Sequence, residues 1–418
     1  MRRLLLLAGL AYLLVLAGLA SKAGGMLALS IPVVLFLAAA LVSGPQRLRL
    51  QASRELSADR VAADAPVVVQ LSLTNRGSRL EQVSIVDLVP QGLELLEGNP
   101  TLVTSLSPGQ ETSLEYVVAA GRGRYDFGEV QATACDHLGL FRRRASVSAP
   151  AQLSVLPSRL RLRRLAIRPL RTRGSAGPVP ARRGGSGIDF FGVREYQVGD
   201  PRRWINWRTS ARHLDNLFTN EFQQERIADV GLILDARRRT DVQFGGNSLF
   251  EHAVQATAAL AESFLIDGNR VGLLVYGHFL DWTFPGYGKV QRELILRALA
   301  RAQTGDSQVF DSFDYLPSRY FPAQSQLVLI SPLCSDDVPM LVRLRARGYQ
   351  LMVIRPDPVT FEIKGREPEP AVELAARVIR VERALALRRL QQAGIQVVDW
   401  QVEKPFDHVV HASLGRMP

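Results

Sequence analysis

The sequence predicts a multidomain chain, with a transmembrane helical hairpin at the amino terminus, then an all-β sandwich, and then an α/β doubly wound domain. Three observations predict this fold class. Two uncharged apolar runs open the chain, short alternating segments separated by turn residues follow, and strand patterns then alternate with helix patterns. With 418 residues, 47% of them hydrophobic, the chain is long enough for two or three folded units.

The first predicted domain, residues 1–46, is a two-span transmembrane hairpin. Leu4 to Ala20 and Met26 to Val42 are uncharged runs of 17 residues, each about 26 Å long as a helix, against a bilayer core of about 30 Å. Arginines flank the outer ends and only Lys22 lies between the runs, so the positive-inside rule predicts a multi-pass inner (cytoplasmic) membrane protein whose soluble domains face the cytoplasm. A cleavable signal peptide is the alternative for the first run, and full export is a second alternative.

Residues 47–157 have the pattern of a β-sandwich. Val67 to Leu73 alternates between apolar and polar residues and stops at Asn75-Arg76-Gly77, and similar short segments recur up to Leu156. Residues 158–187 are rich in Arg, Gly and Pro, a composition that predicts a flexible linker rather than a core.

The net charge of +11 is concentrated in one segment. Between Asp136 and Asp189 there is no acidic residue, and the segment Arg142–Arg183 carries twelve arginines, so the rest of the chain sums to −1. Next to a membrane, such a cluster is attracted to anionic headgroups, and we predict an anionic membrane surface as a partner. Nucleic acid is the less favoured partner, because no recognition module accompanies the arginines.

Residues 226–411 show the alternation of an open α/β sheet. Val230 to Leu234 is a continuous apolar run typical of a strand buried on both faces, and Ser248 with Glu251 forms a capping-box pattern before a helix. The alternation continues to Val397–Trp400, which predicts a mostly parallel sheet with helices on both faces. Such sheets bind ligands at the carboxyl ends of their strands, where the strand order reverses.

Residues 188–225 form a segment of unusual composition, called the signature segment below. Asp200 followed by Pro201 predicts a helix start, which places Trp204, Trp207 and Ala211 on one helical face. Charge-assisted hydrogen bonds are expected around this turn. The candidate interaction residues are Arg194, Glu195, Tyr196, Gly199, Asp200, Arg202, Trp204, Trp207 and Arg212.

Here the sequence resembles a known family. Several stretches look like the signature of bacterial membrane-anchored proteins of unassigned function: Arg194-Glu195-Tyr196, Gly199-Asp200, Arg203/Ile205/Trp207 and Ala211-Arg212, together with residues 122–128 and 136–141. Those proteins carry a von Willebrand factor A-like domain and are usually found alongside MoxR-type AAA+ ATPases. The resemblance covers the whole chain, and it implies that the last domain is A-like and that the partner is a MoxR-type ATPase.

An A-type domain binds Mg²⁺ or Ca²⁺ through an Asp-x-Ser-x-Ser loop after its first strand. Here that loop reads Asp235-Ala236-Arg237-Arg238-Arg239, with arginine at both serine positions. Three guanidinium groups beside one carboxylate repel a dication, so we predict no metal, no cofactor and a pairing of Asp235 with one of the arginines. The loop itself is either a solvated loop or a site for an anionic group or an acidic partner surface.

We find none of the common catalytic motifs and no Cys/His cluster, and therefore predict that the chain is not an enzyme. The favoured function is a non-catalytic membrane-anchored scaffold whose A-like domain engages a MoxR-type ATPase in chaperone-like assembly or envelope maintenance. One alternative is a hydrolase that uses the carboxylates of Asp189, Glu195 and Asp200. The other is a binder of anionic lipid or nucleic acid through the linker arginines.

Overall fold

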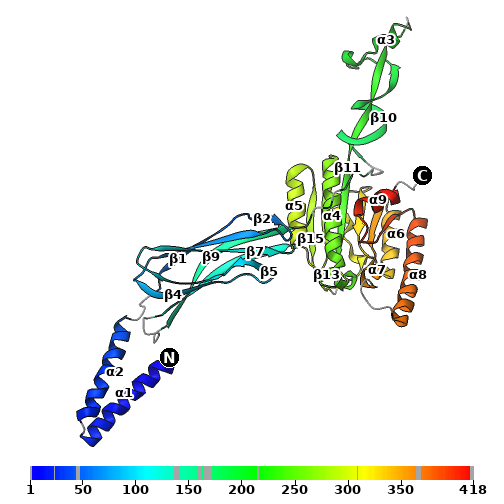
Figure 1. Cartoon of the computed structure of the whole chain (residues 1–418). Helices are drawn as coiled ribbons and strands as arrows, with labels where there is room; N and C mark the ends of the chain where they lie inside the picture. The colour runs from blue at the N-terminus through cyan, green and yellow to red at the C-terminus, as the bar shows by residue number, and fades with distance from the viewer. Residues whose placement is uncertain are drawn as a thin grey trace. The chain divides into compact units, whose positions relative to one another are not determined.

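The computed structural model is shown in Figure 1. It describes residues 2–22, 24–43, 48–135, 142–158, 160, 162–163, 165, 172–213, 216–307, 309–363 and 369–414. The chain divides into two units, Met1–Leu156 and Pro157–Pro418, and each is described by itself below.

Two helices, α1 (Arg2–Ser21) and α2 (Gly24–Ser43), open the chain. In the described part of the chain, no helix combines the length and hydropathy that crossing a bilayer requires. The predicted transmembrane hairpin, and with it the predicted fold class, is therefore wrong. Both helices are short: each apolar run covers about 26 Å, less than the bilayer core. The predicted membrane location rested on these spans and stays a prediction.

The rest of the first unit consists of two β-sheets. The four-stranded sheet has the order β1-β3-β7-β5 and the five-stranded sheet the order β2-β9-β8-β4-β6. Every pair of neighbouring strands is antiparallel except β2 and β9. The strands are β1 (Leu50–Leu56), β2 (Arg60–Ala62), β3 (Val67–Asn75), β4 (Leu80–Asp87), β5 (Leu93–Gly98), β6 (Thr101–Leu106), β7 (Glu111–Ala120), β8 (Gly123–Cys135) and β9 (Arg142–Leu156).

The core of the first unit contains side chains from both sheets. Leu71 and Leu73 of β3 pack in one cluster with Ile85 of β4 and Leu153 of β9, and all four are fully buried. This follows from the two-residue period of a strand, which turns alternate side chains of β3 inward.

A buried polar group joins the two sheets. Arg54 of β1 forms an ion pair with Asp87 of β4, and the hydroxyl of Tyr116 on β7 donates to Asp87 Oδ2 at 2.8 Å. The Arg54 guanidinium lies 4.9 Å from the centroid of the Phe127 ring. Burial and the nearby Asp87 carboxylate raise the pKa of Tyr116, which keeps its hydroxyl a donor.

The second unit is built on a sheet of order β15-β14-β11-β16-β17-β18, with β10 paired to β11 outside that path. Neighbours are parallel except β14 with β15 and β10 with β11. The strand order reverses at β11, because the chain first adds β14 and β15 on one side and then β16 on the other. The strands are β10 (Thr172–Glu195), β11 (Phe218–Ala236), β14 (Arg270–Gly277), β15 (Leu280–Gly286), β16 (Gln326–Ile330), β17 (Gln350–Pro356) and β18 (Gln396–Trp400).

Helices cover both faces of this sheet. Leu341 of α6 and Leu390 of α8 share a buried cluster with Ile233 and Leu329, whereas α4 contacts the sheet without joining that cluster. Ser248 caps α4 by accepting from the Phe250 N–H. The helices are α4 (Leu249–Ile266), α5 (Gly288–Arg301), α6 (Val338–Ala346), α7 (Pro358–Ile363), α8 (Pro370–Gln392) and α9 (Phe406–Leu414).

Part of the predicted linker is a strand. From Thr172 onward, β10 pairs antiparallel with β11, so the linker prediction for residues 158–187 is wrong over its second half. The register shifts between Gly174 and Val179 and again between Gly185 and Phe190. Bulged positions accept Gly and Pro, which is why this composition is compatible with a strand. The boundary predicted at residue 226 falls inside β11, which is continuous.

Candidate functional site

The structure brings polar side chains together where the strand order of the second unit reverses. Asp235 lies at the end of β11, and Ser331 follows the last residue of the neighbouring strand β16. The Ser331 hydroxyl donates to Asp235 Oδ2 at 2.6 Å. In an open α/β sheet this is the position where ligands bind.

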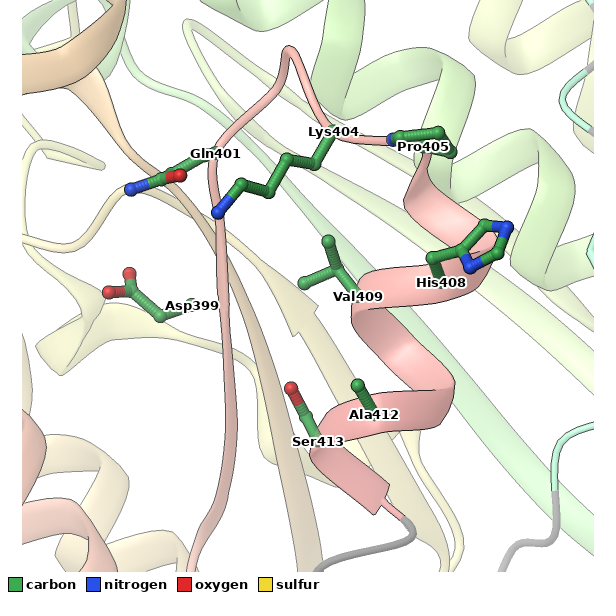
Figure 2. Close-up of a pocket in the computed structure, with 8 residues that line it drawn as sticks. All are labelled: Asp399, Gln401, Lys404, Pro405, His408, Val409, Ala412 and Ser413. Carbon is green, nitrogen blue, oxygen red and sulfur yellow. The ribbon is translucent and has the colours of Figure 1, made fainter.

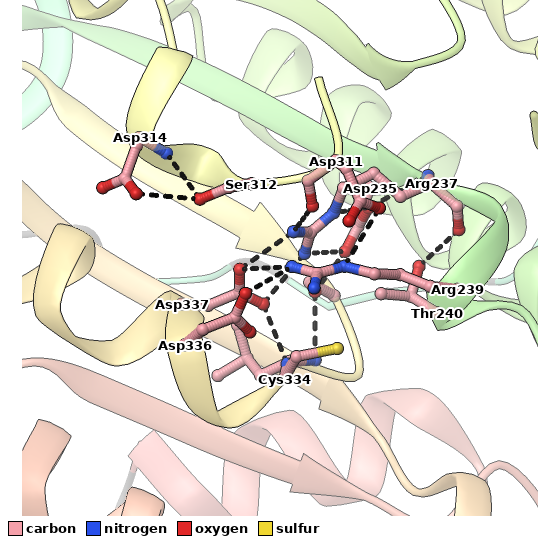
Figure 3. A network of polar contacts seen from close by, with 12 residues as sticks. Asp235, Arg237, Arg239, Thr240, Asp311, Ser312, Asp314, Cys334, Asp336 and Asp337 are labelled. Carbon is pink, nitrogen blue, oxygen red and sulfur yellow. Dashed lines mark hydrogen bonds and ion pairs between the residues drawn. The ribbon is translucent and has the colours of Figure 1, made fainter. Parts of the chain in front are cut away.

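In this protein a side chain of the chain itself occupies that position. Arg237 donates through Nε and Nη2 to the two carboxylate oxygens of Asp235, both at 2.9 Å. The same guanidinium donates through Nη1 and Nη2 to Asp337, at 2.9 and 2.8 Å, and through Nη1 to the carbonyl of Asp311 at 2.9 Å. Figure 3 shows Arg237 with Asp235 and Asp337. These three residues and Ser331 are called the Arg237 cluster below.

The Arg237 cluster is cut off from water. Asp235 is 2% exposed, Arg237 1% and Asp337 0%. The guanidinium lies 3.8 Å from the centroid of the Phe313 ring, a cation–π contact. Burial on its own lowers the pKa of Arg237, but the hydrogen bonds to Asp235 and Asp337 reverse this, so that the pKa is raised above its ordinary value. The guanidinium is therefore a permanent charge that needs both carboxylates.

Local structure fixes the position of Asp337. Its Oδ2 accepts from the Cys334 N–H at 2.8 Å, which caps the short 3₁₀ turn Ser335–Asp337 that leads into α6. Asp337 and the Asp311 carbonyl are not among the residues that the sequence predicts for this site. One signal could have found Asp337. Pro339 marks a helix start soon after a buried strand, and a carboxylate that caps such a helix start lies close to the end of that strand.

The other two loop arginines lie nearer the surface. Arg239 donates to Asp336 at 3.0 Å and lies 3.5 Å from Asp337, and its side chain is 29% exposed. Arg238 is 72% exposed and pairs with the equally exposed Asp306. Each of the three arginines thus has a carboxylate partner.

The residues at this position do not fit a divalent metal. Both oxygens of Asp235 accept from the Arg237 guanidinium, whose positive charge lies between the carboxylates that would act as ligands. A second group, Cys334 with Asp336 and Asp337, has its ligand atoms within 4.8 Å of one another. Burial raises the pKa of Cys334 to about 11, so it stays a thiol, and both aspartates are bonded to arginines.

The signature segment forms its own hydrogen-bonded turn. Arg194 makes a bidentate pair with Asp200, from Nη1 to Oδ2 at 2.8 Å and from Nη2 to Oδ1 at 2.7 Å. Asp200 also accepts from the Gln197 N–H at 2.9 Å, and the Tyr196 hydroxyl donates to the Asp200 carbonyl at 3.4 Å. Gly199 has a φ of 111°, which only glycine adopts readily.

The predicted helix from Asp200 is not continuous. A 3₁₀ turn covers Arg202–Trp204, Ile205 is extended, and a second short helix, α3, covers Trp207–Ser210. Asn206 is its cap and accepts from the Thr209 N–H at 2.9 Å. The Asp200 side chain is held by Arg194 and cannot cap the turn, which is why the prediction was wrong.

The candidate residues of the signature segment separate into two groups. Arg194, Tyr196, Gly199 and Asp200 build the turn, and the Glu195 carboxylate accepts from Asn216 at 3.0 Å. Trp204 is half-buried, and Arg202, Trp207 and Arg212 are exposed. The helix α3 of the segment lies next to the start of β11 (Figure 1). Asp235 lies near the end of the same strand, about 55 Å away for an extended strand.

The arginine-rich segment is described only in part. Arg142, Arg143 and Arg144 are exposed on β9, and Arg163 pairs with Asp407 through Nε at 2.8 Å. The side chains of the other eight arginines of Arg142–Arg183 lie outside the described residues. Contact with an anionic membrane surface stays a prediction.

A separate pocket of about 480 Å³ lies beside α9 (Figure 2). Ser413, His408 and Asp399 line it, a set that would suit a hydrolase. Among the described residues, however, no hydrogen bond joins these three side chains, and Asp399 pairs instead with Arg355, whose Nε donates at 3.0 Å. The pocket does not have the geometry of a catalytic triad.

Comparison with known proteins gives similarities but no activity. Residues 192–361 match the model of a family described as "Protein of unknown function DUF58". The "Uncharacterized protein YeaD" of Bacillus subtilis (strain 168) is 28% identical over 232 residues, which cover 54% of this chain and 56% of that protein. The chain thus matches about half the length of that relative. These matches support a bacterial family of unassigned function.

Similarity to solved structures is weak. The major pilin subunit of Bacillus cereus matches 26% of this chain and 41% of its own, with 3% identity and a TM-score of 0.20. The CARDB domain of a Pyrococcus furiosus protein in complex with di-metal ions matches 26% of this chain and 89% of its own, with 15% identity and a TM-score of 0.18.

Proposed function

We propose that this chain is a non-catalytic interaction protein whose signature segment binds a partner protein. In this proposal the α/β unit is a von Willebrand factor A-like domain in which Arg237 replaces the metal ion, and the partner is a MoxR-type AAA+ ATPase acting in chaperone-like assembly or envelope maintenance. The observation that carries the proposal is the exposure of Trp207, 67% of its surface, on a segment whose backbone is fixed by hydrogen bonds.

A fixed backbone favours binding because little conformational freedom is lost on association. The Arg194–Asp200 pair closes the turn before the 3₁₀ helix, and Asn206 caps α3 and donates to the Asn220 side chain at 2.8 Å. Ser210 accepts from the Phe218 N–H at 2.8 Å, which attaches α3 to β11. Trp207 is therefore presented from a folded surface.

The surface around Trp207 combines apolar and basic groups. Val198 is fully exposed and Leu217 is 47% exposed. Four arginines of the segment are exposed and form no ion pair with any other described residue: Arg202, Arg203, Arg208 and Arg212. Tryptophan and arginine are the residues most enriched at the energetic centres of interfaces. This chemistry fits a partner surface with an apolar pocket and acidic residues around it.

The hydrolase alternative has less support from the geometry. The Asp200 carboxylate is bonded to Arg194, and the exposed Glu195 carboxylate accepts from Asn216. The Asp189 side chain lies outside the described residues. The position at the strand-order reversal is filled by Arg237. A general acid or base must be free to exchange a proton with its substrate, whereas the carboxylates of Asp200 and Asp235 are held by arginines.

The test is a titration of the purified full chain with the purified MoxR-type ATPase of the same organism, by calorimetry. We expect Trp207→Ala to weaken binding by about tenfold or more, as removal of a central interface residue does. The matched control is Tyr287→Ala, because Tyr287 is 68% exposed and lies on the same unit outside the signature segment. Absence of binding by the unmodified chain, or equal affinity of the Trp207→Ala chain, would contradict the proposal.

A further inference from the structure

Helix α8 has two apolar faces, and only one of them is covered. Ala376, Arg383 and Leu390 are spaced by seven residues and face the body of the unit: Ala376 is 4% exposed, Leu390 0%, and the Arg383 side chain 12%. On the rest of the helix, four large apolar side chains are exposed by half or more: Leu374 by 62%, Val378 by 53%, Val381 by 61% and Leu385 by 50%. A helix on a protein surface normally shows polar residues there.

The exposed side chains follow the heptad spacing of a coiled coil. The steps from Leu374 to Val378, Val381 and Leu385 are four, three and four residues, which alternates d and a positions. In this register Ala376, Arg383 and Leu390, which face the body of the unit, all lie at f positions, on the side of the helix opposite the seam. Ala371 extends the seam toward the start of the helix, and Arg388 ends it. The stripe is thus a two-heptad seam without a partner in the described chain.

We propose that this seam pairs in parallel with α8 of a second copy of this chain. Charge selects this partner. Arg377 and Glu382 flank the seam at g and e positions, are exposed, and form no ion pair with another residue of the described chain. In a parallel pair a g residue lies beside the e residue five positions on in the other helix. Arg377 then meets the partner's Glu382, and by two-fold symmetry Glu382 meets the partner's Arg377.

An antiparallel pair loses both contacts. In that arrangement g faces g and e faces e, so Arg377 lies beside an alanine, Ala384, and Glu382 beside Ala375. Leu374 at d and Val378 at a suit the parallel dimer, whereas Val381 at d and Leu385 at a have the reverse order, so the orientation rests on the two charge pairs. Helix α8 lies at the outer edge of the second unit, where a second copy has access (Figure 1).

The seam is short, and this sets the strength of the dimer. Two heptads cover less surface than the roughly 800 Å² per partner of a standard interface. The helix is already folded on its unit, so pairing does not have to order the backbone. We therefore expect a dissociation constant on the order of micromolar.

Sedimentation of the full chain over a range of concentrations tests the proposal. We expect reversible dimers in the unmodified chain and at least a tenfold weaker association in Val378→Asp, because a charge at an a position is buried in the seam. Val290→Asp is the matched control: it makes the same substitution at a valine of α5 that is 75% exposed, and it leaves association unchanged. A monomer at every concentration, or a dimer unaffected by Val378→Asp, overturns the proposal.

The orientation is tested by exchanging the charges. Arg377→Glu and Glu382→Arg, made singly, put like charges side by side and weaken the dimer severalfold, and the double variant restores it. Val378→Cys is expected to form a disulfide with the second copy under mild oxidation, whereas Arg380→Cys, on the same helix outside the seam, does not. The unmodified chain controls for Cys135 and Cys334. A double variant as weak as the singles, or equal crosslinking at 378 and 380, overturns the parallel pairing.

Discussion

Arg237 and Asp235 are two residues apart in the chain, and they face each other through two parallel hydrogen bonds of 2.9 Å. The pairing is local, but it is completed by Asp337, a hundred residues later. One positive charge supplied by the chain therefore connects the carboxyl end of β11 with the start of α6, at the position where open α/β sheets bind ligands.

Replacing Arg237 should strongly destabilise the second unit. Arg237→Ala leaves the carboxylates of Asp235 and Asp337 buried without a counter-charge, which we expect to lower the free energy of unfolding by about 3 to 5 kcal/mol. Urea unfolding followed by tryptophan fluorescence reports on this unit alone, because all four tryptophans lie in it: Trp204, Trp207, Trp282 and Trp400. The control Arg238→Ala removes an exposed pair and should cost less than about 0.5 kcal/mol. A similar loss in both variants would show that the buried pair has no special role.

Introducing a small hydroxyl at position 237 should create a metal site. Arg237→Ser removes the internal cation and leaves oxygen atoms of Asp235, Ser331 and Asp337 facing one cavity, the ligand type that Mg²⁺ prefers. We expect 10 mM Mg²⁺ to raise the melting temperature of this variant by about 3 °C or more, and that of the unmodified chain by less than about 1 °C. Equal shifts in the two proteins would show that Arg237 does not take the place of a cation.

The buried polar group of the first unit gives a graded prediction. Tyr116→Phe removes one hydrogen bond to the Asp87 carboxylate and should cost about 1 to 3 kcal/mol. Arg54→Met leaves Asp87 buried and unpaired and should cost about 3 to 5 kcal/mol. Unfolding followed by far-ultraviolet circular dichroism measures both. Tyr125→Phe is the control, because the Tyr125 hydroxyl donates at an exposed position, to the Gly121 carbonyl. The prediction fails if Arg54→Met costs no more than this control.

His252 should make the stability of the second unit depend on pH. Its ring lies between Phe361 and Trp400, with centroid distances of 5.8 and 6.3 Å, and burial lowers its pKa below the usual 6.5. As pH falls through 6.5, the unfolded imidazole takes up a proton before the folded one, so the free energy of unfolding falls, by at most about 1.4 kcal/mol per pH unit. His252→Phe should reduce this slope between pH 7 and 5, whereas His213→Phe, at an exposed position, should leave it unchanged. An unaltered slope in His252→Phe would refute this.

Local patterns predicted individual elements well. The strand expected at Val230–Leu234 lies within β11, the alternation at Val67–Leu73 within β3, and Ser248 caps α4 as the capping pattern indicates. The pairing of Asp235 with an arginine of its own loop also follows from the sequence. In each case the decisive contact lies within a few residues.

Long-range pairing was not predictable in the same way. Composition indicated a linker at Thr172, but the residues that make it a strand lie at the other side of a hairpin, around Ala228. Asp337 completes the Arg237 cluster from a different helix start, and nothing near Arg237 in sequence points to it. The transmembrane hairpin failed because apolar runs close to the minimum span length were interpreted as spans.

Strand β11 is continuous from the β10–β11 hairpin next to Trp207 to Asp235. There is no break between the part of β11 that pairs with β10 and the part that pairs with β14 and β16. A force applied to the β10–β11 hairpin is therefore transmitted along a single extended backbone into the middle of the sheet. There β11 is hydrogen-bonded to parallel neighbours on both sides, β14 and β16, so the load acts along these strands and must shear many bonds at once. The strand is thus a mechanical link, through which work done on the exposed segment reaches the buried guanidinium at its far end.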